Sequence, residues 1–156
     1  MTDVREAEDK DVTELVRVIN RAYRVEDAFL FGDRTDAAAV RALLAEDTFL
    51  VIDAPDGGVL VAAVHVALRG ERGYFGMLAV DPAEQGHGLA RRLIGAAEDY
   101  AKSHGCHAMD IHVLSLRTEL PPLYRKFGYE TIGTRPFQAS FRPGYESHVL
   151  VMSKPL

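Results

Sequence analysis

The sequence predicts a single α/β domain over residues 1–156, built on a mixed and mostly antiparallel sheet flanked by helices. Three observations support this prediction. Short β-branched or apolar runs alternate with segments of helical apolar spacing. One glycine loop joins a strand directly to a helix, and no linker-like change in composition divides the chain.

The first third of the chain predicts a short strand and two helices. Residues 4–7 have strand character, and Asp11 with Glu14 three residues later predicts a capping box that opens a helix. A second short helix is expected from Asp36 to Ala45. The first helix has apolar residues at helical spacing: Val12, Leu15, Val16, Ile19, Ala22 and Tyr23.

Three strands are expected next, over residues 48–53, 59–68 and 74–80. The turn signals between them, at residues 55–58 and 69–73, are short, so the three strands should form an antiparallel meander.

The second half predicts a helical crossover followed by the end of the sheet. An apolar stripe from Leu89 to Tyr100 predicts a helix that Gly105 can close. The strand at residues 108–114 follows this crossover and should therefore run parallel to the strand before it. A short helix over residues 120–127, with Gly128 as its cap, precedes closing strands at 129–134 and 147–152.

Composition excludes several classes of function. The 47% apolar and 26% charged content is that of a globular protein, and no apolar run reaches the ~20 residues that span a bilayer. The acidic N-terminus does not resemble a secretory signal, so we expect a cytoplasmic protein without membrane contact. Net charge of −5 without a long basic run disfavours nucleic acid, and the single Cys106 excludes a disulfide or a cysteine-based zinc site, so no metal is expected.

The most informative segment is the glycine loop between the strand ending at Val80 and the helix opening at Leu89. Such a junction leaves backbone N–H groups without partners at the positive end of the helix dipole, and glycine lets an anion approach closely. We therefore expect a pyrophosphate site. A dinucleotide-binding fingerprint has the pattern Gly-x-Gly-x-x-Gly, but counted from Gly86 its third glycine is replaced by Arg91. The Gly-Lys-Ser/Thr sequence of a Walker phosphate-binding loop is also absent. Taken alone, the loop could also be a tight turn without a ligand.

Two motifs together resemble the GNAT superfamily of N-acetyltransferases. Gln85-x-x-Gly88-x-Ala90 is similar to the Gln/Arg-x-x-Gly-x-Gly/Ala signature of that family, and it follows a Leu-x-Val-Asp-Pro strand end. Leu123-Tyr124, followed by Gly128-Tyr129, resembles the family's second element at the expected distance. With the order of helices and strands, the resemblance extends over nearly the whole chain.

The resemblance implies acetyl-CoA as co-substrate. The strands ending near Val80 and Leu114 would splay apart to admit the thiol end, and Tyr124 would be the general acid that protonates the leaving thiolate. A primary amine of a small molecule or a peptide would be the acceptor. The implied cofactor-binding residues are Leu78, Ala79, Val80, Gln85, Gly86, His87, Gly88, Leu89, Ala90 and Arg91.

Two departures from the family pattern leave choices open. The asparagine that many members carry after the second splayed strand is missing, so Ser115 or Arg117 must replace it or the contact is lost. The strand before the glycine loop lacks a carboxylate base. Among the strand histidines His65, His112 and His148, we prefer His112 as base because it lies beside the expected splay.

The acceptor pocket should lie in the least regular segments, residues 25–34 and 135–146. Phe29, Phe31 and Phe137 would roof a pocket for an amine with an apolar body, or would instead anchor these loops to the core. A sensor that binds acetyl-CoA without turnover is the alternative function. The apolar run at 149–152 fits either a homodimer interface or a central strand of the monomer.

Overall fold

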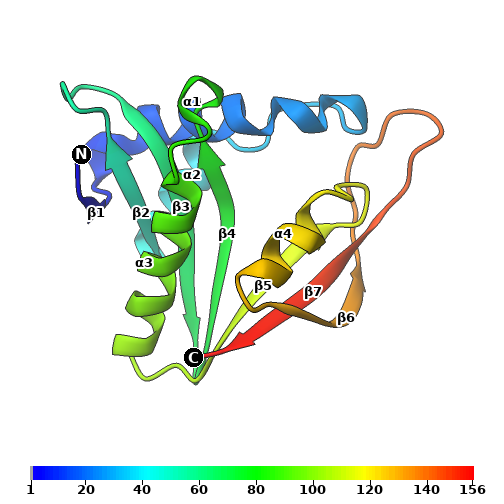
Figure 1. Ribbon diagram of the computed structural model, residues 1–156. Coiled ribbons are helices and arrows are strands. Elements are labelled where there is room, and N and C mark those ends of the chain that lie inside the picture. The colour runs from blue at the N-terminus through cyan, green and yellow to red at the C-terminus, as the bar shows by residue number, and fades with distance from the viewer. Residues whose placement is uncertain (1) are drawn as a thin grey trace.

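A seven-stranded sheet in the order β1-β2-β3-β4-β5-β7-β6 runs through the computed structural model, which describes residues 2–156 (Figure 1). Most elements begin and end within two residues of their predicted bounds. The strands are β1 (Val4–Glu6), β2 (Thr48–Asp53), β3 (Leu60–Arg69), β4 (Arg72–Val80), β5 (Ala108–Leu114), β6 (Glu130–Pro136) and β7 (His148–Pro155). The helices are α1 (Val12–Tyr23), α2 (Ala37–Glu46), α3 (Leu89–Ser103) and α4 (Leu120–Lys126), with 3₁₀ turns η1 (Asp9–Asp11), η2 (Arg24–Ala28) and η3 (Pro82–Glu84).

The predicted topology is confirmed. Strands β2, β3 and β4 form the antiparallel meander, and α3 carries the chain to β5, which pairs with β4 in parallel. Every other pairing between the named strands is antiparallel. The sheet is therefore mixed and mostly antiparallel.

The predicted capping box at the start of α1 is wrong. The Asp11 carboxylate accepts a hydrogen bond from the Glu8 amide (2.8 Å) and pairs with Arg5 (2.9 Å), so it does not cap α1. Glu14 accepts from the Leu60 amide (2.8 Å) and pairs with Arg17. Both carboxylates therefore bind partners other than the first amides of α1. A local sequence motif cannot reveal that such partners compete for them.

Helices cover both faces of the sheet, and each face has its own apolar core. On the face of α3 and α4, Phe75, Leu93 and Tyr129 are almost completely buried. On the opposite face, Leu15, Ile19 and Phe49 are buried beneath α1 and α2. Figure 1 shows α3 and α4 side by side in front of the strands.

The two halves of the sheet are joined over only a short distance. β4 pairs with β5 only from Arg72 to Tyr74, opposite residues 108–110, after which the strands diverge (Figure 1). A bulge in β4 accompanies the divergence, because Ala63 pairs with Ala79 but His65 pairs with Gly76. Met77, inside this bulge, has φ of +49°.

The bulge reverses the alternation of side chains along β4. Phe75 packs into the core beneath α3 and α4, whereas Ala79, four residues later, packs into the core beneath α1. Without an extra residue, both would face the same side. As a result Leu78 and Val80 face α3 and α4, on the side where the glycine loop begins.

The C-terminal strand β7 occupies the middle of its half of the sheet. It pairs with β5 along residues 149–155 and with β6 along residues 148–153. The apolar run at 149–152 is therefore explained by a central position in the monomer, one of the two interpretations that the sequence allowed. The homodimer stays a prediction.

A buried amide side chain fixes the irregular segment between α1 and α2. Asn20 donates to the Thr35 carbonyl (3.0 Å) and accepts from the Thr35 amide (2.9 Å), and both residues are buried. This pair of hydrogen bonds acts like one rung of a strand ladder and holds the chain next to Arg34 against α1.

We predict that Asn20→Ala lowers the free energy of unfolding by about 2 kcal/mol, because it leaves two buried backbone groups of Thr35 without partners. Urea unfolding followed by circular dichroism measures this change. Thr13→Ala, an exposed substitution on the same helix, serves as the control and should change stability by less than about 0.5 kcal/mol. Equal stability of the two variants would contradict the role given to Asn20.

Candidate active site

Three adjoining cavities follow the line along which β4 and β5 part. The central cavity, of about 240 Å³, lies between these strands and α4. The loop-side cavity, of about 270 Å³, extends from there to the glycine loop, and the roof cavity, of about 290 Å³, lies under η2 and the segment after it. Tyr23 lines all three, and Tyr124 lines the first two. The cavities therefore adjoin one another at Tyr23, and together they are called the groove.

The glycine loop has the geometry of an anion site. Gly86 and Gly88 have φ of +86° and +76°, and a Cβ on either would meet no atom within 4 Å. Gly88 is the N-cap of α3, whose first backbone hydrogen bond runs from the Arg92 amide to the Gly88 carbonyl (3.1 Å). The amides just before Arg92 therefore point outward without helical partners, beside open space that suits a pyrophosphate.

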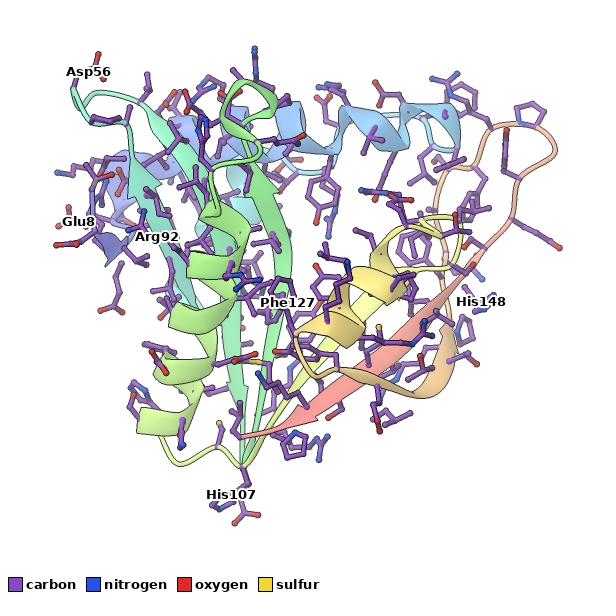
Figure 2. The ribbon with its side chains drawn as sticks, viewed as in Figure 1. Glu8, Asp56, Arg92, His107, Phe127 and His148 are labelled. Carbon is purple, nitrogen blue, oxygen red and sulfur yellow. The ribbon has the colours of Figure 1, made fainter. Side chains whose placement is uncertain are left out.

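Most of the predicted cofactor-binding residues lie together along the loop-side cavity. The exceptions are Ala79, which is buried beneath α1, His87, which lies 3.4 Å from the Glu84 carboxylate, and Arg91. The Arg91 guanidinium lies over the Phe127 ring, which is found between the ribbons of α3 and α4 (Figure 2). Those that line the cavity are Leu78, Val80, Gln85, Gly86, Gly88, Leu89 and Ala90.

The two candidates for the missing asparagine contact are in different places. The Ser115 hydroxyl lies 2.5 Å from the Ser147 hydroxyl, and Ser115 lines none of these three cavities within residues 2–156. Arg117 lines the loop-side cavity and forms ion pairs with Glu26 (2.9 Å) and Glu119. Arg117 is therefore the residue beside the expected cofactor path.

Tyr124 lies where the loop-side and central cavities meet. Its ring packs against Phe75 and Tyr129, with centroid distances of 6.1 and 6.0 Å, and its side chain is mostly buried. Burial raises the pKa of the Tyr124 phenol, and the nearby Tyr23 adds to the shift. The hydroxyl is thus protonated at neutral pH and can donate a proton into the groove.

His112 reaches the central cavity from the face of the sheet opposite to α4. Its ring lies 5.1 Å from that of Tyr74, which also lines the cavity. Burial lowers the pKa of His112 below its ordinary value, and the positive charges of Arg135 and Arg69 lower it further, against a smaller opposing effect of Asp110. The imidazole is therefore neutral at pH 7 and can accept a proton.

The other two strand histidines lie outside the groove within residues 2–156. The His65 imidazole is buried and shares a hydrogen bond with the Asp47 carboxylate (2.9 Å). His148 is exposed at the start of β7 (Figure 2). Of the three candidates, only His112 lines the central cavity.

Sequence reasoning missed two tyrosines of the site. Tyr23 ends the apolar stripe of α1 and looked like a core residue, but it lines every part of the groove, where burial raises its pKa to about 12. Tyr74 lines the central cavity, and its hydroxyl lies 2.7 Å from the position of a Cβ on Gly76, so a larger residue there would displace the Tyr74 side chain. The sequence feature that could have pointed to Tyr74 is its position two residues before Gly76 on the same strand.

The two irregular segments meet at the roof cavity, which residues of both segments line. Figure 1 shows the loop between β6 and β7 reaching the segment that follows α1. The Phe31 amide donates to the Ser140 carbonyl and the Arg142 amide donates to the Phe29 carbonyl, both at 2.8 Å. Phe31 and Phe137 line the roof cavity, whereas the Phe29 ring packs edge-on against Tyr145. Two of the three predicted acceptor-pocket aromatics therefore face a cavity.

Residues 2–156 contain no group of three or more histidine, cysteine or acidic side chains placed to hold a metal ion. In the same part of the chain, no helix combines the length and the apolar character needed to cross a bilayer.

The sheet parts beside the glycine loop at the N-terminus of α3, and the Tyr124 phenol lies where the loop-side and central cavities meet. This arrangement suits an enzyme with a large, phosphate-bearing substrate. Residues 12–129 match the Acetyltransferase (GNAT) family. The match extends over most of the chain, which therefore belongs to this family of acetyltransferases.

Solved structures with low sequence identity share the fold. The ribosomal-protein-S18-alanine N-acetyltransferase of Escherichia coli superposes with a TM-score of 0.81 at 15% identity, covering 99% of this chain and 94% of that one. The Salmonella typhimurium protein yncA, in a structure with its cofactor acetyl-CoA, gives 0.76 at 22% identity, covering 100% and 94%.

A curated relative comes from Mycobacterium leprae. This uncharacterized protein is 32% identical over 123 residues, which is 76% of this chain. The present chain spans only 33% of the relative's length.

We predict that Gly88→Val weakens acetyl-CoA binding by roughly 10-fold or more, because a branched side chain strains the left-handed backbone and fills the space beside the loop amides. Gly57→Val is a matched control: Gly57 has φ of +77° and equally open surroundings, but lies in the turn between β2 and β3. Calorimetric titration and thermal unfolding separate affinity from stability. Similar melting temperatures with a loss of affinity only in Gly88→Val are expected. Equal affinities would mean that Gly88 serves only the turn.

Proposed function

We propose that this protein is an acetyl-CoA-dependent N-acetyltransferase that transfers the acetyl group to a primary amine by direct attack on the thioester. The observation that carries the proposal is the position of Tyr124 at the junction of the loop-side and central cavities, with neutral His112 reaching the central cavity from the other face of the sheet. A proton donor and a proton acceptor thus lie in one groove.

The loop-side cavity fits the phosphate-bearing half of acetyl-CoA. The amides at the start of α3 would hold the pyrophosphate, and the backbone of Leu78 and Val80, on a strand edge that β5 has left, would bind the pantetheine arm. When bound there, acetyl-CoA supplies an activated acetyl group. The yncA structure, which has the same fold, contains acetyl-CoA as its cofactor, and this supports the choice of acetyl-CoA as the donor.

The chain's own residues divide the proton transfers between the two faces of the sheet. His112 accepts the proton that the acceptor ammonium must lose, and the amine nitrogen then forms a bond to the acetyl carbon. The carbon–sulfur bond breaks, and the Tyr124 hydroxyl donates its proton to the departing thiolate sulfur. The nitrogen loses its second proton as the amide forms, and this proton restores the Tyr124 phenol. The products are an N-acetylated acceptor and free CoA, and the proton held by His112 returns to solvent.

The decisive experiment compares Tyr124→Phe with the wild type in a thiol-release assay over an amine panel. Removing the hydroxyl keeps the packing, so kcat should fall by ~100-fold while acetyl-CoA affinity stays nearly unchanged. Tyr129→Phe is the matched control, because that ring neighbours Tyr124 but its hydroxyl donates to Glu98 (2.7 Å) away from the groove. Unchanged turnover in Tyr124→Phe would remove the acid role. Binding of acetyl-CoA without turnover of any amine would instead identify a sensor.

The pH dependence tests His112. Because the pKa of His112 is depressed, its neutral form persists to acidic pH, and the acidic limb of kcat/KM should lie below pH 6.5 once rates are corrected for the fraction of neutral amine. His112→Gln should abolish this limb and lower kcat/KM by ~100-fold. Arg69→Gln removes a positive charge near the imidazole, so the limb should move to higher pH. A limb that stays in place in both variants would assign it to another group.

A further inference from the structure

Three arginines surround the acceptor end of the groove. Arg34 and Arg135 line the central cavity, and the Arg69 guanidinium lies over the Tyr74 ring, 4.7 Å from its centroid. Within residues 2–156, none of the three forms an ion pair with a carboxylate. This excess of positive charge is found in a chain whose net charge is −5.

The carboxylates near the groove already have cationic partners. Glu26 lines the central cavity but pairs with Arg117 (2.9 Å), and both side chains are largely buried. In the roof cavity Asp33 (2.5 Å) and Asp27 (3.8 Å) share Arg24 as their partner, and on β5 Asp110 pairs with Arg72 (2.6 Å). A polycationic acceptor would therefore meet arginines rather than available carboxylates.

We propose that the acceptor carries an anionic group close to its amine, as a free amino acid does, and that Arg34 and Arg135 bind its carboxylate. This inference rests on the proposed acetyltransferase function and names the class of its acceptor. Guanidinium groups suit the task because their planar forks match the two oxygens of a carboxylate.

The strand register places the anion site close to the base. His112 pairs with Val151, which pairs with Gly133, so these three residues share one face of the sheet. Arg135 lies two residues beyond Gly133 and faces the same side. Across two strand spacings of about 4.8 Å and along one two-residue repeat of roughly 7 Å, the backbones of His112 and Arg135 are about 12 Å apart. Both side chains line the central cavity, so the two side chains and a small amino acid together can span this separation.

Arg34 completes the site from the opposite wall. Its backbone position is fixed because the next residue, Thr35, is held by both hydrogen bonds of Asn20. The Arg34 guanidinium lies 5.3 Å from the Tyr23 ring centroid, facing the groove. Tyr23, Pro136 and Phe137 supply apolar surface nearby for the acceptor's side chain.

The test compares matched acceptors that differ only in the carboxylate. Leucine, methionine and phenylalanine are assayed beside their carboxamides, their decarboxylated amines and dipeptides that begin with the same residue. We expect kcat/KM for the best amino acid to exceed that for its carboxamide by roughly 10–100-fold, the worth of a charge-assisted hydrogen-bonded pair. Faster acetylation of carboxamides, dipeptides or spermidine would overturn the proposal.

Charge-neutral variants identify the side chains responsible. Arg34→Gln and Arg135→Gln should raise KM for the amino acid by about 10-fold or more while changing KM for the carboxamide much less. Arg41→Gln, an exposed substitution on α2 at a residue that lines none of the three cavities, is the control and should leave both unchanged. Because Arg135 also acts on His112, kcat is compared at a pH where the imidazole is neutral in every variant. Equal loss for both acceptors in the two variants would assign the arginines a structural role.

A binding measurement decides the matter even if no panel amine is acetylated. N-acetylleucine, a product analogue, should raise the melting temperature of the CoA-bound protein more than N-acetylleucinamide does, and Arg135→Gln should remove the difference. Equal shifts in the wild type would refute the anion site. Failure of CoA itself to stabilise the protein would instead refute the proposed function, so the two failures are distinguishable.

Discussion

The site depends on the point at which β4 stops pairing with β5. Three residue pairs hold the strands together, and past Tyr74 and Asp110 the backbone of β4 has no neighbour on that side. Met77, with φ of +49°, accompanies the bulge that turns the strand, and a backbone conformation of this kind costs on the order of 1–3 kcal/mol. Long ladders on both sides of the break, β3 with β4 and β5 with β7, stabilise the two halves independently. The groove can therefore remain open while the sheet stays intact.

Because the sheet parts, the groove can be reached from both of its faces. Tyr124 comes from α4 on one face, whereas His112 and Tyr74 project from the other. The bulge extends this division along β4, since it turns Leu78 and Val80 toward the glycine loop and Ala79 toward α1. A donor that enters by the loop-side cavity and an acceptor that enters under the roof would meet only where the strands separate. This arrangement would keep the proposed donor and acceptor on separate paths until they meet there.

The charges around the groove differ in balance from the net charge of the whole chain. The chain is acidic, which by itself hints weakly at a cationic acceptor. Near the groove, however, the carboxylates of Glu26, Asp33 and Asp110 are paired with Arg117, Arg24 and Arg72, of which Arg117 and Arg24 each hold a second carboxylate as well. Arg34 and Arg135 line the central cavity together with His112. Burial lowers the pKa of the imidazole, and the positive charges of Arg135 and Arg69 lower it further. The arginines beside the groove would thus affect both the pKa of His112 and the binding of the proposed acceptor.

The sequence by itself determined the order of helices and strands, the parallel crossover from β4 to β5, the glycine loop and the candidate role of Tyr124. These follow from local periodicity, from turn chemistry and from motifs of fixed spacing, which need no knowledge of distant contacts. Only the tertiary structure decided the rest. The bulge at Met77 has no sequence signature, and the capping box at Asp11 failed because Arg5 and Leu60 compete for its carboxylates. Tyr23 and Arg34 enter the groove because long-range contacts, such as the Asn20 hydrogen bonds to Thr35, bring segments far apart in the chain to one place.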